Sequence, residues 1–188
     1  MSEASIYLTQ IKELSETLEQ VIAEVPPAQF NERPGPHLNP VGWNCFHLLR
    51  VWEVDVNMIC RGQSLHGDAW HRGGFTEKSG YDPVGKGALG LGDGYGYSDD
   101  DVDEIQIDPA VLSEYQQLLW EETSAYLSDA SDDEMHRQAP TVLDPYRTKS
   151  VAEQLRHVIA HSYEHVGEMR YAMGMLGWSD PSYPGSSD

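Results

Sequence analysis

The segment HSYEH at residues 161–165 combines the residue types most able to hold a metal ion. His161 and His165 are four residues apart, so on an α-helix their rings lie one turn apart and can converge on one ion. The same letters match H-x-x-E-H, the pattern of the inverted zinc proteases. The segment therefore suggests a peptidase site, a different metal site or an ordinary turn of surface helix.

The residues after the motif argue against a peptidase. An inverted zinc protease takes its third ligand, a glutamate, from far downstream, and only 23 residues follow His165. Glu168 is the one acidic residue between His165 and the C-terminal tail, and it lies on the same predicted helix. A di-iron bundle site is also excluded, because no predicted helix carries the required Glu-x-x-His arrangement.

His47 is the candidate third ligand. It falls within an apolar stripe of the second predicted helix, together with Trp43, Val51, Val54 and Met58. A histidine among apolar residues needs a partner for its ring nitrogens, which a backbone carbonyl, a buried water or a metal can provide. A lone histidine would favour the carbonyl or water, but two further histidines on another helix favour a metal site with three histidine ligands.

Other residues near the predicted triad have alternative roles. Glu164 is a candidate general base, although its position opposite the apolar face favours a solvated or salt-bridged carboxylate, so the catalytic residue remains unknown. His157 is rotated toward solvent and Cys45 points away from His47, so neither is predicted to bind the metal. Trp43 and Met58 are predicted to line the pocket or the core.

The elements that must position these residues are four amphipathic helices. Asn39-Pro40 and Asp108-Pro109 each place a cap residue before a proline, and Ser150 opens a capping box for the last helix. This pattern predicts an all-α fold, an antiparallel four-helix bundle. The predicted helices span residues 5–25, 40–61, 109–128 and 151–176.

A long glycine-rich loop separates the second and third helices. Residues 62–107 hold eleven of the 17 glycines, which disfavours a long helix or strand there. We expect part of this loop to act as a lid on the histidine pocket, with Trp70, Tyr81, Tyr95 or Tyr97 nearest the metal position, and with Trp70 and Tyr81 as pocket-lining residues. A plain excursion packed by its own side chains is the alternative.

Composition limits the partners. The 188 residues fit one domain, residues 1–188, and the net charge of −19 disfavours nucleic acid and anionic membranes. The acidic N-terminal segment does not resemble a signal peptide, and no apolar run reaches the length of a membrane span. We therefore expect a cytoplasmic protein that acts on a small molecule, with Cys45 and Cys60 as reduced thiols.

Two segments resemble a known family. The sequences HVIAHSYEHVGEMRYAMGMLG and NPVGWNCFHLLRVWEVDVN are similar to the last and second helices of the DinB superfamily, which are four-helix-bundle, metal-dependent proteins. The resemblance spans residues 5–177 and implies that His47, His161 and His165 form the metal triad. It also implies a homodimer, because bundles of this family often pair through their helices.

One part of the family pattern is missing. Where the family often has His-Arg-Gly-Gln, this chain has His165-Val166-Gly167-Glu168, so the usual arginine and glutamine have no counterpart. Three histidines leave an open coordination position, the pattern of catalytic metal sites, and imidazole suits zinc or nickel.

The resemblance implies a thiol-dependent reaction, because some relatives are transferases or isomerases that use a low-molecular-weight thiol. The leading hypothesis is therefore a metal-dependent transferase or isomerase. A metal-assisted hydrolase is the second hypothesis, and a non-catalytic protein that binds a metal or a small ligand is the third. A fourth protein ligand on the ion would favour a structural metal, whereas a lid over an open position would favour an enzyme.

Overall fold

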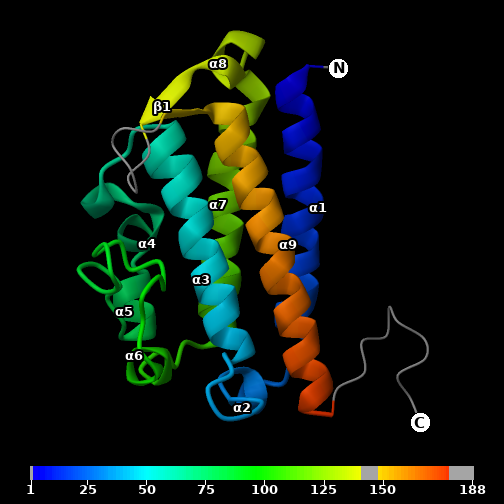
Figure 1. Ribbon diagram of the computed structural model, residues 1–188, viewed down its shortest axis with the longest axis vertical. Coiled ribbons are helices and arrows are strands. Elements are labelled where there is room, and N and C mark those ends of the chain that lie inside the picture. The colour runs from blue at the N-terminus through cyan, green and yellow to red at the C-terminus, as the bar shows by residue number, and fades with distance from the viewer. Residues whose placement is uncertain (1, 141–147, 178–188) are drawn as a thin grey trace.

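The fold is described by a computed structural model for residues 2–140 and 148–177. This part of the chain is mainly helical (Figure 1). Helix α1 packs against α7 and α9, and α3 packs against the same two helices, so a shared apolar core lies between them. The long helical segments are α1 at Glu3–Glu24, α3 at Val41–Glu53 with its π-helical continuation η1 at Val54–Cys60, α7 at Pro109–Asp129 and α9 at Val151–Met175.

Short elements connect these helices. A small antiparallel sheet, in which Gln138 pairs with Ser150, precedes α9 and was not predicted from the sequence. Its strands are only three residues long, too short to produce a recognisable alternation of apolar and polar residues. The short elements are α2 at Pro27–Phe30, η2 at Leu65–Gly67, α4 at Ala69–Arg72, α5 at Phe75–Ser79, α6 at Asp99–Asp103, α8 at Asp132–His136, β1 at Gln138–Pro140 and β2 at Thr148–Ser150.

The starts of the long helices follow their capping residues. The Asp108 side chain accepts a hydrogen bond from the backbone N–H of Ala110 at the start of α7, and Ser150 forms the predicted capping box at the start of α9. The prediction for α3 was wrong by one residue. Pro40 itself occupies the cap position with an extended backbone, so Asn39 lies outside the helix and no side chain caps it.

Helix α3 is buried along its whole length, from residue 41 to residue 53. Two of these residues are charged, and a charge without a partner in the interior is costly. The Arg50 guanidinium meets this requirement by donating from Nη1 to Glu53 Oε2 at 2.6 Å and to Asp68 Oδ2 at 2.9 Å. The hydroxyl of Tyr115 also donates to Glu53, which completes a buried polar network.

The same guanidinium fixes the glycine-rich loop. Arg50 donates from Nη2 to the carbonyl of Leu91 at 3.0 Å and from Nε to the carbonyl of Gly92 at 3.3 Å. Gly92 has a φ of +64°, and a Cβ at this position would lie 2.1 Å from the carbonyl oxygen of Pro83. Only glycine fits this close approach, so the loop follows a defined course beside α3.

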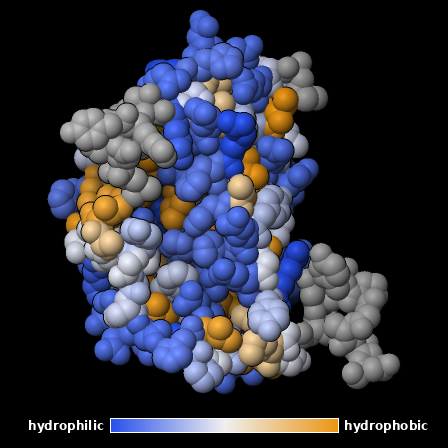
Figure 2. All heavy atoms as spheres, in the orientation of Figure 1, coloured by the Kyte–Doolittle hydropathy of each residue, from blue (hydrophilic) through white to orange (hydrophobic). Residues whose placement is uncertain are grey.

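Hydrophilic side chains cover most of the face shown in Figure 2, and the apolar side chains on it form smaller groups. Leu89 and Tyr95 belong to the large hydrophobic residues that remain exposed. None of the helices in the described ranges is long and apolar enough to cross a membrane.

Removing the Arg50 guanidinium should destabilise the protein strongly. The change Arg50→Met would leave Glu53 buried without a cation and Asp68 with His71 alone, which costs about 3–5 kcal/mol in the free energy of unfolding. Arg61→Met is the matched control, because Arg61 pairs with Glu122 at a partly exposed site, where a pair contributes about 0–1 kcal/mol. Equilibrium urea unfolding measures the free energy of unfolding of both variants. Equal losses of this free energy in the two variants would contradict the role assigned to Arg50.

Candidate metal centre

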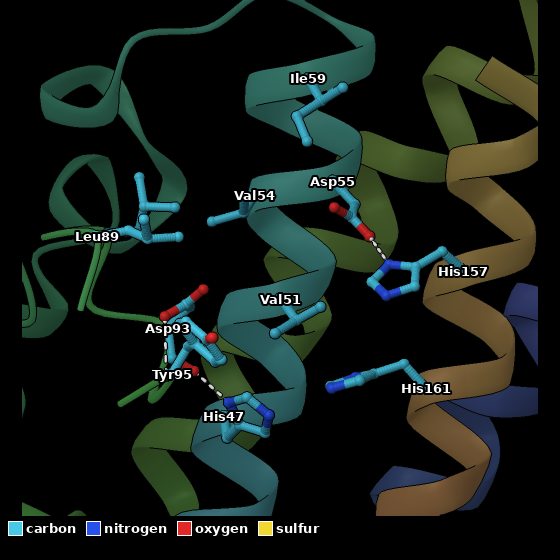
Figure 3. A pocket seen from close by; sticks show the side chains of 11 residues that line it. His47, Val51, Val54, Asp55, Ile59, Leu89, Asp93, Tyr95, His157 and His161 are labelled. Atoms are coloured by element: carbon cyan, nitrogen blue, oxygen red, sulfur yellow. Dashed lines mark hydrogen bonds and ion pairs between the residues drawn. The ribbon is translucent and has the colours of Figure 1, made fainter. Parts of the chain in front are cut away.

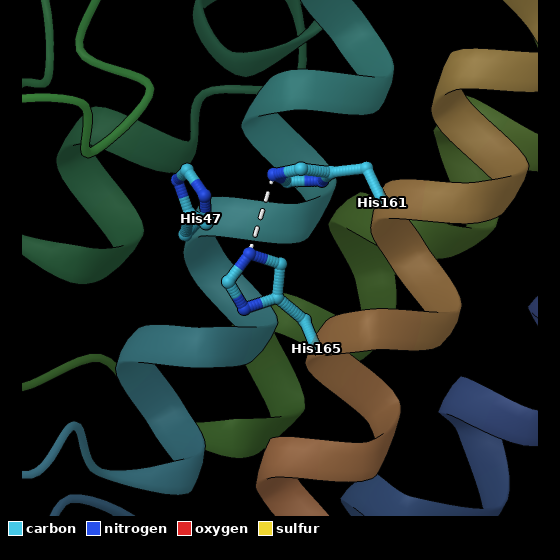
Figure 4. A group of neighbouring side chains, drawn as sticks. All are labelled: His47, His161 and His165. Carbon is cyan, nitrogen blue, oxygen red and sulfur yellow. Dashed lines mark hydrogen bonds between the residues drawn. The ribbon is translucent and has the colours of Figure 1, made fainter.

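Three histidines from two helices converge on one point. His47 extends from α3, and His161 and His165 extend from the facing side of α9; Figure 3 shows His47 and His161 beside a cavity, and Figure 4 shows all three rings. One nitrogen from each ring lies within 4.8 Å of the others. The Nε2 atoms of His161 and His165 are 3.2 Å apart. The sequence prediction that these three residues meet is therefore confirmed.

Hydrogen bonds orient two of the rings. His47 donates from Nδ1 to the backbone carbonyl of Asp93. Nδ1 of His165 lies 2.9 Å from both Asn44 Oδ1 and Glu168 Oε2, and these oxygens can only accept its proton. In a neutral ring the proton on Nδ1 leaves Nε2 with a free lone pair. Both rings therefore present Nε2 as the nitrogen available to a metal.

The buried position of the rings keeps two of them uncharged. Burial lowers the pKa of His47 to about 4, although its bond to the Asp93 carbonyl opposes the shift. Burial, with the neighbouring histidines, lowers the pKa of His161 to about 3. Neutral imidazole is the form that coordinates a metal, so both rings are ready for coordination at neutral pH.

The close approach of His161 and His165 fits either an N–H···N hydrogen bond between the two rings or a metal ion shared by them. With Nδ1 of His165 donating, its Nε2 carries a lone pair directed at Nε2 of His161. Nδ1 of His161 is buried and has no hydrogen-bond partner in the described part of the chain. A shared proton would satisfy one pair of nitrogens, whereas one metal ion would accept lone pairs from all three rings.

A side chain of α3 and the backbone of the glycine-rich loop both pack on the His47 ring. The indole of Trp43 stacks on this imidazole, with ring centroids 4.8 Å apart and an interplanar angle of 14°. On the loop, a Cβ at Gly94 would lie 2.7 Å from His47 Nδ1, and Gly94 has a φ of +97°. Glycine at position 94 therefore allows the backbone to reach the ring and the neighbouring Asp93 carbonyl to accept its proton.

A cavity of about 480 Å³ opens beside the histidines. At its edge His157 Nδ1 lies 2.5 Å from Asp55 Oδ2. This hydrogen bond raises the pKa of His157, while burial raises the pKa of Asp55. The cavity wall contains both apolar residues and ionisable ones: His47, Val51, Val54, Asp55, Ile59, Leu89, Leu91, Asp93, Tyr95, His157 and His161.

Three of the residues expected to line this pocket lie elsewhere. Trp70 is fully buried, because its indole packs in an aromatic cluster with Phe46, Phe75 and Tyr115. Tyr81 packs on the same Phe46 ring. Met58 packs against a small apolar group that includes Val54. Val54 lines the cavity, but Met58 does not. Of the loop aromatics, Tyr95 is the one that lines the cavity, and Trp43 reaches the site through His47.

The other candidates are placed as their helical positions indicated. Glu164 is exposed and lines a separate surface groove with His37 and Tyr171, so it does not face the histidine cavity. Cys45 is buried, and its sulfur lies 3.1 Å from that of Met169. Neither residue belongs to the three-histidine group.

Sequence reasoning missed the residues that support the site. Asn44 and Glu168 lie three residues from His47 and His165 respectively, one helical turn away, and this spacing could have indicated them. Asp55 lies eight residues after His47 on the same face of the helix. Asp93 lies in a glycine-rich stretch with no periodic pattern, so no signal in the sequence pointed to it.

Comparisons with known proteins show the family and the fold of the chain. The sequence model of the DinB superfamily matches residues 10–169. The crystal structure of a conserved protein from Enterococcus faecalis is similar over 95% of this chain and 99% of that chain, with a TM-score of 0.76 and 16% sequence identity. At this identity the likeness shows the fold alone. No curated protein matches the chain.

The hydrogen bonds predict the tautomers of the metal-free protein. Long-range proton–nitrogen NMR spectra at neutral pH should show His47 and His165 with the proton on Nδ1, because Asp93, Asn44 and Glu168 present oxygens to that atom. The exposed His66 serves as the reference for a ring in water. A proton on Nε2 of His47 or His165 would contradict the assigned orientation.

Proposed function

Because this chain belongs to the DinB superfamily, we propose that it binds one divalent metal ion through His47, His161 and His165 and uses that ion to act on a small molecule. The observation that carries the proposal is the convergence of three imidazole nitrogens within 4.8 Å beside a cavity. We also assign the four long helices to the antiparallel four-helix bundle of a single domain, which their mutual contacts support.

The donor set fits a metal of the zinc or nickel type. All three donors are imidazoles, and the burial of His47 and His161 favours their neutral, coordinating form. The bonds from Nδ1 of His47 and His165 to Asp93, Asn44 and Glu168 are the kind that fix ligand orientation in metal sites.

An open coordination position favours an enzyme over a structural metal. Within the described residues the group contains three histidines and no fourth ligand. When bound, a divalent ion lowers the pKa of a thiol or water at its open position and so supplies a nucleophile near neutral pH. The volume of about 480 Å³ is in the range of small-molecule sites.

The loop contributes to this proposed active site as a wall. Leu89, Leu91, Asp93 and Tyr95 line the cavity from the loop side, and the buried Arg50 holds the carbonyl of Leu91. An apolar wall beside a reactive thiolate or water would exclude bulk water and select substrates by shape. We therefore propose that the loop closes the cavity as a lid.

The leading chemistry is transfer or isomerisation that depends on a low-molecular-weight thiol. In this account the histidines hold the ion, Asp93 and Asn44 hold the histidines, and the cavity orients the second reactant. Metal-assisted hydrolysis is the alternative, since the same open position can take water. A non-catalytic protein that binds a metal or a small ligand is the remaining alternative.

The metal content of histidine variants tests the proposal. The wild-type protein should bind about one equivalent of zinc or nickel, and His161→Ala should bind none stoichiometrically, because two imidazoles hold a divalent ion poorly. His66→Ala is the matched control, since His66 is exposed and outside the triad. Elemental analysis after gel filtration measures metal content, and far-ultraviolet circular dichroism should show unchanged helix content. A fully loaded His161→Ala protein would refute the metal centre.

A thiol titration tests the chemistry separately. Nickel-loaded protein should develop a thiolate-to-metal absorption band when cysteine, glutathione or 2-mercaptoethanol is added, and His161→Ala should not. If no thiol produced the band while the metal-loaded protein hydrolysed a nitrophenyl ester, the hydrolase alternative would replace the thiol-dependent one.

A further inference from the structure

In the part of the chain that the structure describes, the buried charges are paired, with one exception. The described part of the chain has five charged residues that are more than nine-tenths buried: Arg50, Glu53, Asp55, Asp68 and Asp93. Arg50 forms ion pairs with Glu53 and Asp68, and Asp55 pairs with His157. Asp93, which is 8% exposed, forms no ion pair within the described residues.

Within the described residues the one hydrogen bond of the Asp93 side chain is local. Its Oδ1 accepts from the backbone N–H of Tyr95 at 3.0 Å, which closes a turn within the loop. The backbone carbonyl of Asp93, not its carboxylate, accepts the proton of His47. In Figure 3 the carboxylate points away from His47, among the residues that line the cavity. A buried carboxylate is thus presented to the space that a ligand would fill.

A buried carboxylate without a cation is costly, and a ligand that brings a cation removes that cost. The cavity also has apolar walls, since Val51, Val54, Ile59 and Leu91 line it together with its ionisable residues. An inorganic cation would leave these walls without contacts. An organic cation satisfies both the carboxylate and the apolar walls, because its nitrogen pairs with the carboxylate while its carbon atoms cover the apolar surface. The net charge of −19 also attracts cations to the protein.

We propose that the cavity recognises a small organic ammonium ion, with Asp93 as the specificity-determining residue and the apolar wall of Val51, Val54 and Leu91 around its carbon chain. This inference rests on the proposed function in one respect: the cavity beside the histidines is the substrate site. It adds the chemical class of the substrate, a primary aliphatic amine whose reacting end faces the three histidines.

Simple amines test this recognition without a known substrate. n-Alkylammonium ions of three to six carbons are compared with n-alkanols of equal length in ligand-observed NMR titrations of the zinc-loaded and the metal-free protein. The best ammonium ion should bind about tenfold more tightly than its alkanol, the strength of a typical bond to a charged group. The metal-free protein shows that the amine does not bind by coordinating zinc.

Two variants locate the effect. Asp93→Asn removes the charge but keeps an oxygen for the Tyr95 N–H, so the turn is retained and the ammonium preference should fall to about one. Asp100→Asn makes the same charge change at an exposed residue of α6 and should keep the preference. The wild-type comparison of ammonium ion and alkanol stands even if Asp93→Asn folds poorly.

The outcomes separate this inference from the proposed function. Equal binding of ammonium ion and alkanol by the wild-type protein, absence of binding by both, or a preference that survives Asp93→Asn would overturn the role of Asp93. Loss of zinc in Asp93→Asn but not in Asp100→Asn would also overturn it, since the change at Asp93 would then act on the metal site and not on substrate recognition. Failure of the wild-type protein to take up zinc would refute the metal proposal, while the metal-free titration would still decide the role of Asp93.

Discussion

The arrangement of the site depends on the pairing of one buried cation. Arg50 lies within a helix that is buried on all sides, and its guanidinium satisfies two buried carboxylates and two loop carbonyls together. Such a group is stable only with its partners in place. Because the loop carbonyls belong to Leu91 and Gly92, the next residue, Asp93, is held beside His47, one helical turn from Arg50. The buried network thereby connects the core of the fold to the orientation of a metal ligand.

The consequence for chemistry is a site whose orientation is set in advance. The loop and the helices hold Nδ1 of His47 and His165, so the free lone pairs converge before any ion arrives, and Trp43 stacks on one ring to limit its rotation. The side of the rings facing the cavity carries Asp55, Asp93 and His157 among apolar walls. The same loop segment therefore supports the proposed metal through its backbone and meets the proposed substrate through its side chains.

The sequence predicted the features that depend on local periodicity. The spacing of His161 and His165, the apolar setting of His47 and the cap residues Asp108 and Ser150 are all short-range signals, and the structure agrees with them. The course of the loop was harder to predict from the sequence, because it depends on contacts between residues that are distant in the sequence. Trp70 packs on Tyr115, and Asp93 contacts His47 across 46 positions of sequence. Glycines at positions 92 and 94 permit these approaches, but their partners cannot be identified from the sequence.

The coordination of the metal by all three histidines is the central claim, and X-ray absorption spectroscopy of the zinc-loaded protein tests it most directly. Zinc held by this triad should show three imidazole nitrogens at about 2.0–2.1 Å, from His47, His161 and His165, with an oxygen or nitrogen atom of a small molecule completing the coordination. A first shell with fewer than three imidazoles, or with sulfur from Cys45 or Cys60, would contradict it.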